Sequence, residues 1–257
     1  MRVAFCLSGL AREQVANFQY TKEGVLDKWD VDVFASVWTE DYTGIFESEH
    51  EKLVELYKPV SYVFRNPIDL VTPFLADYPR KDRWRNFDRT YPEKKKYRSS
   101  WGRTNVLNMY FQIYNANLLR KAYEELKGFQ YDVVIRARAD GGWAINHELL
   151  TDPNTVYLHN LKDTYPSDWF AYGSGKVMDA YSATWLNLRE AALFMEDNEV
   201  HEKTHEQAWY KWMDPHRCLR FQLEKKNPWI TVKVMERADI RSQGHRGVAE
   251  VMKEKGI

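Results

Sequence analysis

Short apolar runs separated by polar segments recur along the first 65 residues. Residues 3–7, 31–37 and 60–64 are rich in β-branched and aromatic side chains, so each run predicts a strand. Residues 47–57 place charges between apolar positions at helical spacing, and Lys58-Pro59 would end that helix. Strand, connection, strand, helix, strand is the rhythm of an α/β fold with a mostly parallel sheet covered by helices.

The second half of the chain continues this rhythm after an interruption. Residues 104–126, 176–196 and 205–213 predict helices, and residues 131–138, 156–159 and 229–235 predict strands. Residues 69–102 contain Pro73, Pro79 and Pro92 and show no clean period, so we expect a long basic surface loop or lid there. We expect one domain over residues 1–257, with about 197–257 as a C-terminal region that closes over an acceptor.

Composition excludes several classes of protein. Hydrophobic residues make up 44% of the 257 and charged residues 29%, as in ordinary globular proteins, and the formal net charge is zero. No overall field therefore favours nucleic acid or a membrane, and no apolar stretch approaches the roughly 20 residues that span a bilayer. The two distant cysteines, Cys6 and Cys218, fit reduced thiols in a cytoplasmic protein. The motifs of P-loop NTPases, GxSxG hydrolases and GxGxxG dehydrogenases are missing from the sequence.

The stretch VVIRARADGG joins a buried-looking strand to three charged residues. Side chains alternate along a strand, so Arg136, Arg138 and Asp140 would share one face. A buried arginine needs an anion, and a ligand diphosphate with a divalent cation on the carboxylate would supply one. An internal salt-bridge network, in which Asp140 neutralises the arginines, is the alternative.

A stripe of amides marks the helix that precedes this strand. Asn105, Asn108, Gln112 and Asn115 recur at spacings of three and four and therefore lie on one face. Uncharged amides suit hydrogen bonds to a sugar, although a merely polar helix face has the same pattern.

Two acid–base candidates and one isolated histidine lie further along the chain. Asp168, beside two large aromatic residues, could act as a general base, bind a sugar hydroxyl or cap a turn. Glu206 follows Thr204, which with Gln207 forms a capping box, so its carboxylate lies in the first turn of a helix. His245 lies between two glycines, Gly244 and Gly247, in the SQGHRG segment.

The basic stretch 78–103 is interleaved with aromatic residues, a pattern that can bind single-stranded nucleic acid. A loop that closes over an anionic donor or acceptor explains the stretch equally well. Neither reading is decided by the sequence.

Taken in order, several segments resemble the small GT-A-like glycosyltransferases of bacterial lipopolysaccharide and capsule clusters and of some large DNA viruses. The matching segments are MRVAFCLSGLAR, DVFASVWTED, YKPVSYVF, NVLNMYFQIYNAN, YDVVIRARAD and DWFAYGSGKVMDAYS. The series extends to about residue 190. The resemblance implies a single GT-A-like (Rossmann-like) domain, a UDP-, GDP- or dTDP-sugar donor, a glycan hydroxyl as acceptor, and hexosyl or pentosyl transfer.

The resemblance also assigns roles to particular residues. Ser8, Gly9 and Arg12 would line the nucleotide end of the donor site, beside the arginines and amides named above. The R-x-R-x-D run would stand where the family carries a metal-binding DxD motif, with Arg138 in place of the first Asp. Asp140, with His245 as a late ligand, would then hold Mn²⁺ or Mg²⁺.

The acceptor hydroxyl needs a base if the enzyme inverts, and Glu206 or Asp168 would supply it, with a slight preference for Glu206. A sugar-phosphate nucleotidyltransferase would also use arginines, a carboxylate and a metal. It usually carries a glycine-rich basic loop after its first strand, of which SGLAR is a poor version.

Overall fold

The central sheet is built around β1 (Arg2–Leu10), which pairs in parallel with β2 (Asp30–Trp38) on one side and β4 (Val133–Arg138) on the other. The computed structural model describes residues 1–40, 48–79, 93–160, 166–199, 214–236 and 239–243. Within them, the strand order of the large sheet is β3-β2-β1-β4-β7-β6-β8. The other members are β3 (Ser61–Arg65), β6 (Thr155–Asn160), β7 (Pro166–Gly173) and β8 (Thr231–Met235).

Of these seven strands, β7 alone runs antiparallel to its neighbours. Its amino-terminal residues therefore lie beside the carboxyl end of β4. The predicted α/β fold with a mostly parallel sheet is confirmed.

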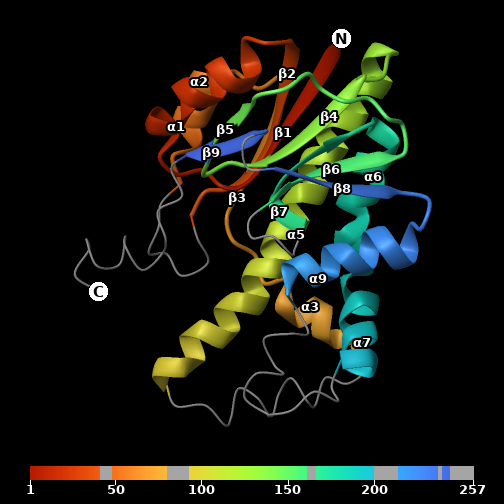
Figure 1. Ribbon diagram of the computed structural model, residues 1–257. Helices are drawn as coiled ribbons and strands as arrows, with labels where there is room; N and C mark the ends of the chain where they lie inside the picture. The colour runs from red at the N-terminus through yellow and green to blue at the C-terminus, as the bar shows by residue number, and fades with distance from the viewer. Residues whose placement is uncertain (41–47, 80–92, 161–165, 200–213, 237–238, 244–257) are drawn as a thin grey trace.

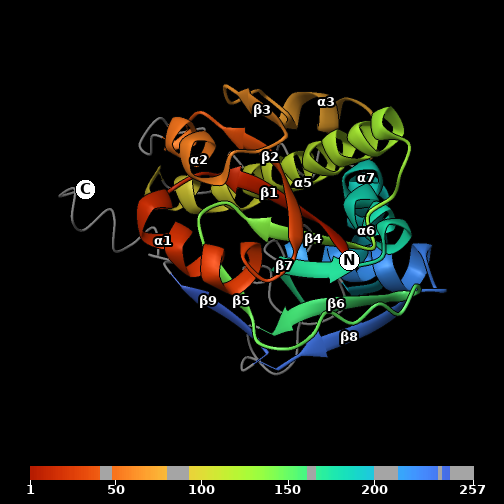
Figure 2. The same ribbon diagram turned by 90° about the horizontal axis from the view of Figure 1, so that it is seen from above.

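Helices cover both faces of the sheet, as Figures 1 and 2 show. One face carries α3 (Val71–Ala76), α5 (Glu93–Lys127), α6 (Gly175–Ser182), α7 (Leu188–Glu199) and α9 (Pro215–Arg220). The other face carries α1 (Gln14–Thr21), α2 (His50–Tyr57) and a small antiparallel sheet of β5 (Gly142–Ile145) and β9 (Ile240–Gln243). Short helical turns follow α1 (Lys22–Leu26), α6 (Ala183–Asn187) and α9 (Phe221–Lys226).

The alternation of side chains along the central strands divides the core in two. On β1, Ala4 and Cys6 pack under α5, whereas Val3, Phe5 and Leu7 pack toward α1 and α2. On β4, Ala137 and Ala139 lie on the α1 side, as the alternation predicts. Arg136 alternates with these alanines and therefore lies on the α5 side of β4.

Buried polar side chains of α1 hold the turn that follows β4. The amide of Gln14 donates to the backbone oxygen of Ala139, and the Thr21 hydroxyl accepts from the backbone N–H of Trp143 at 3.0 Å. A Cβ at Gly142 would lie 3.1 Å from the backbone oxygen of Asn17, so the glycine permits this close approach. The turn carrying Asp140 is thus fixed against a helix.

The expectation of a loop over all of residues 69–102 is wrong in part, because α3 and the first turns of α5 lie within it. Glu, Lys and Arg are good helix formers, which favours helix from Glu93 onward although no apolar stripe marks it. Pro73 lies in the first turn of α3, where proline is tolerated. The expected helix over 205–213 lies outside the described residues.

Among the described residues, no helix combines the length and the apolar character that crossing a membrane requires.

Candidate functional site

Three neighbouring strands bring polar side chains to one end of the sheet. Ser8 of β1 is aligned with Ser36 of β2 and with Arg138 of β4. The carboxyl ends of parallel strands form the usual ligand edge of an α/β sheet. Because β7 is antiparallel, Asp168 and Trp169 near its start join the same edge.

Asp140 is held by two guanidinium groups. Arg138 donates from Nε to Oδ1 at 2.9 Å and from Nη2 to Oδ2 at 2.7 Å, and Arg12 also donates to Oδ2. Burial acts to lower the pKa of Arg138. The negative charge of Asp140 and its hydrogen bonds to Arg138 outweigh this effect, so the pKa of Arg138 is raised. The guanidinium of Arg138 also lies 5.1 Å from the ring centre of Trp169, in cation–π range. The internal salt-bridge network, which was the alternative to a ligand, is therefore present at Arg138. Arg12, which the sequence did not assign to it, also belongs to this network.

This arrangement does not fit a divalent cation. Both oxygens of Asp140 accept hydrogen bonds from guanidinium groups, which would repel a metal ion placed there. In the described part of the chain, no three His, Cys, Asp or Glu side chains gather closely enough to hold a metal ion. His245, the other expected ligand, lies outside the described residues, so the Mn²⁺ or Mg²⁺ site stays a prediction.

Arg136 is the most unusual side chain at this edge. It is 2% exposed, and none of its three guanidinium nitrogens has a hydrogen-bond partner. Burial lowers its pKa, while Tyr181 and Asp168 oppose that shift. A buried cation without hydrogen bonds is costly, and an anionic ligand would relieve that cost.

Amide side chains of α5 pack against the same edge of the sheet. Gln112 is fully buried, and its Oε1 accepts a hydrogen bond from the Ser36 hydroxyl, while its Nε2 has no partner. Ser8 Oγ and Asn108 Oδ1 are also buried without hydrogen bonds. Asn105, one turn earlier, is exposed. Asn108 and Gln112 of the stripe are therefore buried, whereas Asn105 is exposed and Asn115 is half-buried.

Gly9 lies between Ser8 and the turn toward Arg12. Its φ of 112° falls in a region that residues with a Cβ rarely adopt, and a Cβ there would meet no atom within 4 Å. Gly9 therefore borders open space at the end of β1.

Asp168 is buried and lies 3.2 Å from Nδ1 of His216, measured at its Oδ1. Its backbone oxygen accepts a hydrogen bond from the Tyr181 hydroxyl at 3.5 Å. His216 was missed by the sequence reasoning, because a lone histidine after Asp214-Pro215 carries no motif. Glu206, the other expected base, lies outside the described residues.

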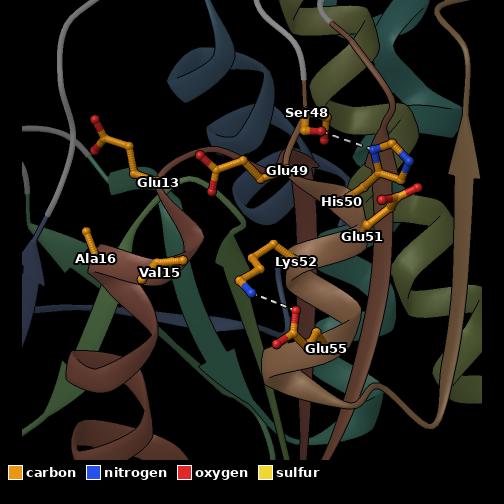
Figure 3. A pocket seen from close by; sticks show the side chains of 9 residues that line it. All are labelled: Glu13, Val15, Ala16, Ser48, Glu49, His50, Glu51, Lys52 and Glu55. Atoms are coloured by element: carbon orange, nitrogen blue, oxygen red, sulfur yellow. Dashed lines mark hydrogen bonds and ion pairs between the residues drawn. The ribbon is translucent and has the colours of Figure 1, made fainter.

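A groove of about 690 Å³ opens beside the β1–α1 turn, between α1 and α2 (Figure 3). Its charged lining consists mainly of carboxylates, with one lysine, Lys52, which pairs with Glu55 at 2.6 Å. Glu49 accepts from the backbone N–H of Gln14 at 2.7 Å and so fixes the start of α1. This negative groove does not suit a phosphate, and none of the arginines of the sheet edge lines it.

Comparisons with known proteins complete the picture. No family model matches the chain, and no curated protein matches it. Among solved structures, the apo form of the glycosyltransferase GlyE from Streptococcus pneumoniae TIGR4 is similar over 92% of this chain, with 8% sequence identity and a TM-score of 0.37. This chain spans 45% of the length of that structure, and the likeness is too low to carry a functional argument.

Proposed function

We propose that the protein is a glycosyltransferase that moves a sugar from a nucleoside-diphosphate donor to a hydroxyl of a glycan. One observation carries the proposal: Arg136 is a buried guanidinium without a hydrogen bond at the carboxyl edge of a mostly parallel sheet. A diphosphate supplies the oxygens that such a group lacks. The resemblance of the sequence to GT-A-like glycosyltransferases supports the choice of a nucleotide sugar over other diphosphates.

In this proposal the arginines bind the leaving diphosphate. Arg136 donates hydrogen bonds to the diphosphate from the α5 side of the sheet. Arg138 and Arg12, which Asp140 holds together, also donate to it. Charge that develops on the leaving phosphate is stabilised by donors already oriented before the reaction, the usual source of electrostatic catalysis. Asp140 orients two of these arginines, and no step is assigned to a metal ion.

The buried amides contact the uncharged part of the donor. Gln112 Nε2 can donate, Asn108 Oδ1 can accept, and Ser8 Oγ can do either. Together they present both donors and acceptors to hydroxyl groups, as a sugar or a ribose requires. We place the reaction in the cytoplasm, which suits the two buried free cysteines.

A thermal-shift panel of UDP-, GDP- and dTDP-sugars, each with and without Mn²⁺, tests the proposal directly. We expect at least one donor to raise the Tm, since a ligand that binds only the native state stabilises it. The Arg136→Met protein should not respond to that donor. A panel in which no nucleotide sugar shifts the Tm would refute the proposal.

The metal expectation has a separate test at Asp140. If Asp140 positions arginines, Asp140→Asn lowers transfer by the same factor at every Mn²⁺ concentration. If instead it holds the metal, the variant requires more Mn²⁺ for half-maximal transfer. We expect the first result, because both carboxylate oxygens are engaged by guanidinium groups.

A further inference from the structure

His216 and Asp168 form a pair that reaches from the core to the surface. The Asp168 side chain is 4% exposed and that of His216 is 25% exposed, with Nδ1 and Oδ1 3.2 Å apart. The imidazole is therefore the member of the pair that is more open to a sugar hydroxyl, and the carboxylate lies deeper. Asp168, one of the two bases expected from the sequence, contacts this imidazole through Oδ1.

We propose that His216 is the general base of the transfer reaction and that Asp168 is the positioning residue behind it. This inference rests on the proposed function, because it needs an acceptor hydroxyl. It adds a residue on α9 to a site whose other members lie on the sheet and on α5.

The chain fixes His216 in place from both sides. The carbonyl of Pro215, the preceding residue, accepts a hydrogen bond of 2.5 Å from the Tyr110 hydroxyl on α5. Asp214 caps α9 by accepting from the backbone N–H of Arg217 at 3.0 Å. In Figure 1, β1 runs downward from the N-terminus, and α9 lies in the lower half, toward which the carboxyl ends of the parallel strands point. Because the imidazole contacts Asp168 near the start of β7, it lies at the ligand edge.

Asp168 also connects the imidazole to the arginines. Its charge acts on both Arg136 and Arg138, so it lies close to the groups assigned to the diphosphate. A carboxylate behind an imidazole fixes the tautomer and stabilises the imidazolium that forms when the ring takes a proton. The base and the leaving-group site are thus joined through one buried carboxylate.

Nδ1 of His216 lies 3.2 Å from Oδ1 of Asp168, but the two atoms are not aligned as a hydrogen bond, because Asp168 Oδ1 has no partner of hydrogen-bond geometry. Hydrogen bonds between catalytic groups are often poorly aligned before substrate binds and tighten in the complex. We expect the acceptor to complete the alignment.

The proposed step moves one proton and one sugar. His216 Nε2 takes the proton of the acceptor hydroxyl while that oxygen forms a bond to the anomeric carbon of the donor. The bond from this carbon to the phosphate oxygen breaks, and its electron pair leaves with the nucleoside diphosphate. The imidazolium later releases the proton to water. Attack from the side opposite the leaving group inverts the anomeric centre.

The decisive variant is His216→Asn, which keeps a side-chain N–H near Asp168 but has no basic nitrogen. With the donor and acceptor identified by the panel and a transfer assay, we expect kcat to fall about 10²–10⁴-fold, the usual worth of a general base. The Kd of the donor should stay unchanged. Imidazole added to His216→Ala should restore part of the rate, which a purely structural role would not allow. Arg220→Ala, on the same helix in an exposed pair with Glu224, is the matched control and should transfer normally.

The outcomes separate this inference from the proposed function. If His216→Asn binds the donor and transfers sugar at the full rate, the inference is overturned and the proposed function is unaffected. Full transfer by His216→Asn together with a large loss in Glu206→Gln assigns the base to Glu206 instead. Retention of the anomeric configuration in the product also overturns the inference. A chain that binds no nucleotide sugar refutes the function itself.

Discussion

Arg136 is a buried cation without a hydrogen bond, at the carboxyl end of the sheet. Its position on β4 places a long cationic side chain under α5, close to Tyr110, Tyr181 and Asp168. Desolvation of a charge is expensive, and here no hydrogen bond offsets it. If Arg136 served only the stability of the fold, an apolar residue would stabilise it at least as well. The charge of Arg136 therefore indicates a ligand.

We therefore expect Arg136→Met to separate stability from binding. Without ligand, its free energy of unfolding should equal that of the wild type or exceed it by up to about 4 kcal/mol, the range found when buried charges are replaced by apolar residues. Urea denaturation measures this difference. Arg138→Met, which breaks the ion pair with Asp140, should instead lower the free energy of unfolding. A loss of several kcal/mol in Arg136→Met would show that Arg136 stabilises the fold.

At the same scale, the sequence indicated which neighbouring side chains share a face but not how the side chains pair. Alternation placed Arg136, Arg138 and Asp140 together, and spacing placed Asn108 and Gln112 on one stripe. The bond between Arg12 and Asp140 joins residues 128 positions apart, and no local pattern encodes it. The partner of Asp168 was missed for the same reason.

Among the elements, α5 and α6 are joined by a buried ionic cluster outside the candidate site. The Arg120 guanidinium, which is 1% exposed, donates to Glu124 at 2.5 Å and also to Asp179 of α6. Asn117 donates to the same Asp179 oxygen at 2.8 Å. The cluster orients α6 and, through it, Tyr181.

Removal of Arg120 should destabilise the fold strongly. We expect Arg120→Ala to lower the free energy of unfolding by about 3–5 kcal/mol, because the remaining partners lose a buried cation. Lys121→Ala is the control, since Lys121 contacts the same Asp179 at 3.0 Å but is half exposed. It should cost less than about 1 kcal/mol. Equal losses in the two variants, measured by urea denaturation, would contradict this assignment.

The elements themselves were predictable to different degrees. The apolar runs of β1, β2 and β4 stand out because buried parallel strands need such runs on both faces. β7 was missed because Asp168, polar but buried, interrupts its apolar pattern near the start. The first turns of α5 were missed because charged residues replace the apolar stripe that reveals a helix.

At the scale of the whole molecule, the rhythm of elements predicted the class of fold but not the order of its strands. Strand order depends on contacts between distant segments, such as the parallel pairing of β6 with β8, which lies beyond α9 in the chain. The reversal of β7 is equally non-local, and it carries Asp168 to the ligand edge. The proposed function therefore depends on a feature of topology that short-range patterns do not contain.

Burial of ionisable groups makes the stability of the whole molecule sensitive to alkaline pH. Burial raises the pKa of Cys6 from its ordinary 9.0 to about 12, and that of Tyr57 from 10.0 to about 12. Above pH 9 the unfolded chain releases these protons while the native chain keeps them, so the unfolded state gains stability. The contribution of each group is complete below its unfolded pKa and is lost as the pH rises toward 12.

We expect the urea midpoint to be level from pH 7 to about 8.5 and to fall steadily from pH 9 to 11. In Cys6→Ala the fall between pH 9 and 10 should be shallower, because one group that ionises only in the unfolded chain has been removed. Comparison of the slopes cancels the cost of the small cavity that the substitution leaves, since that cost does not vary with pH. Parallel pH curves for the two proteins would mean that the Cys6 thiol ionises equally in both states, which is incompatible with its burial at 2% exposure.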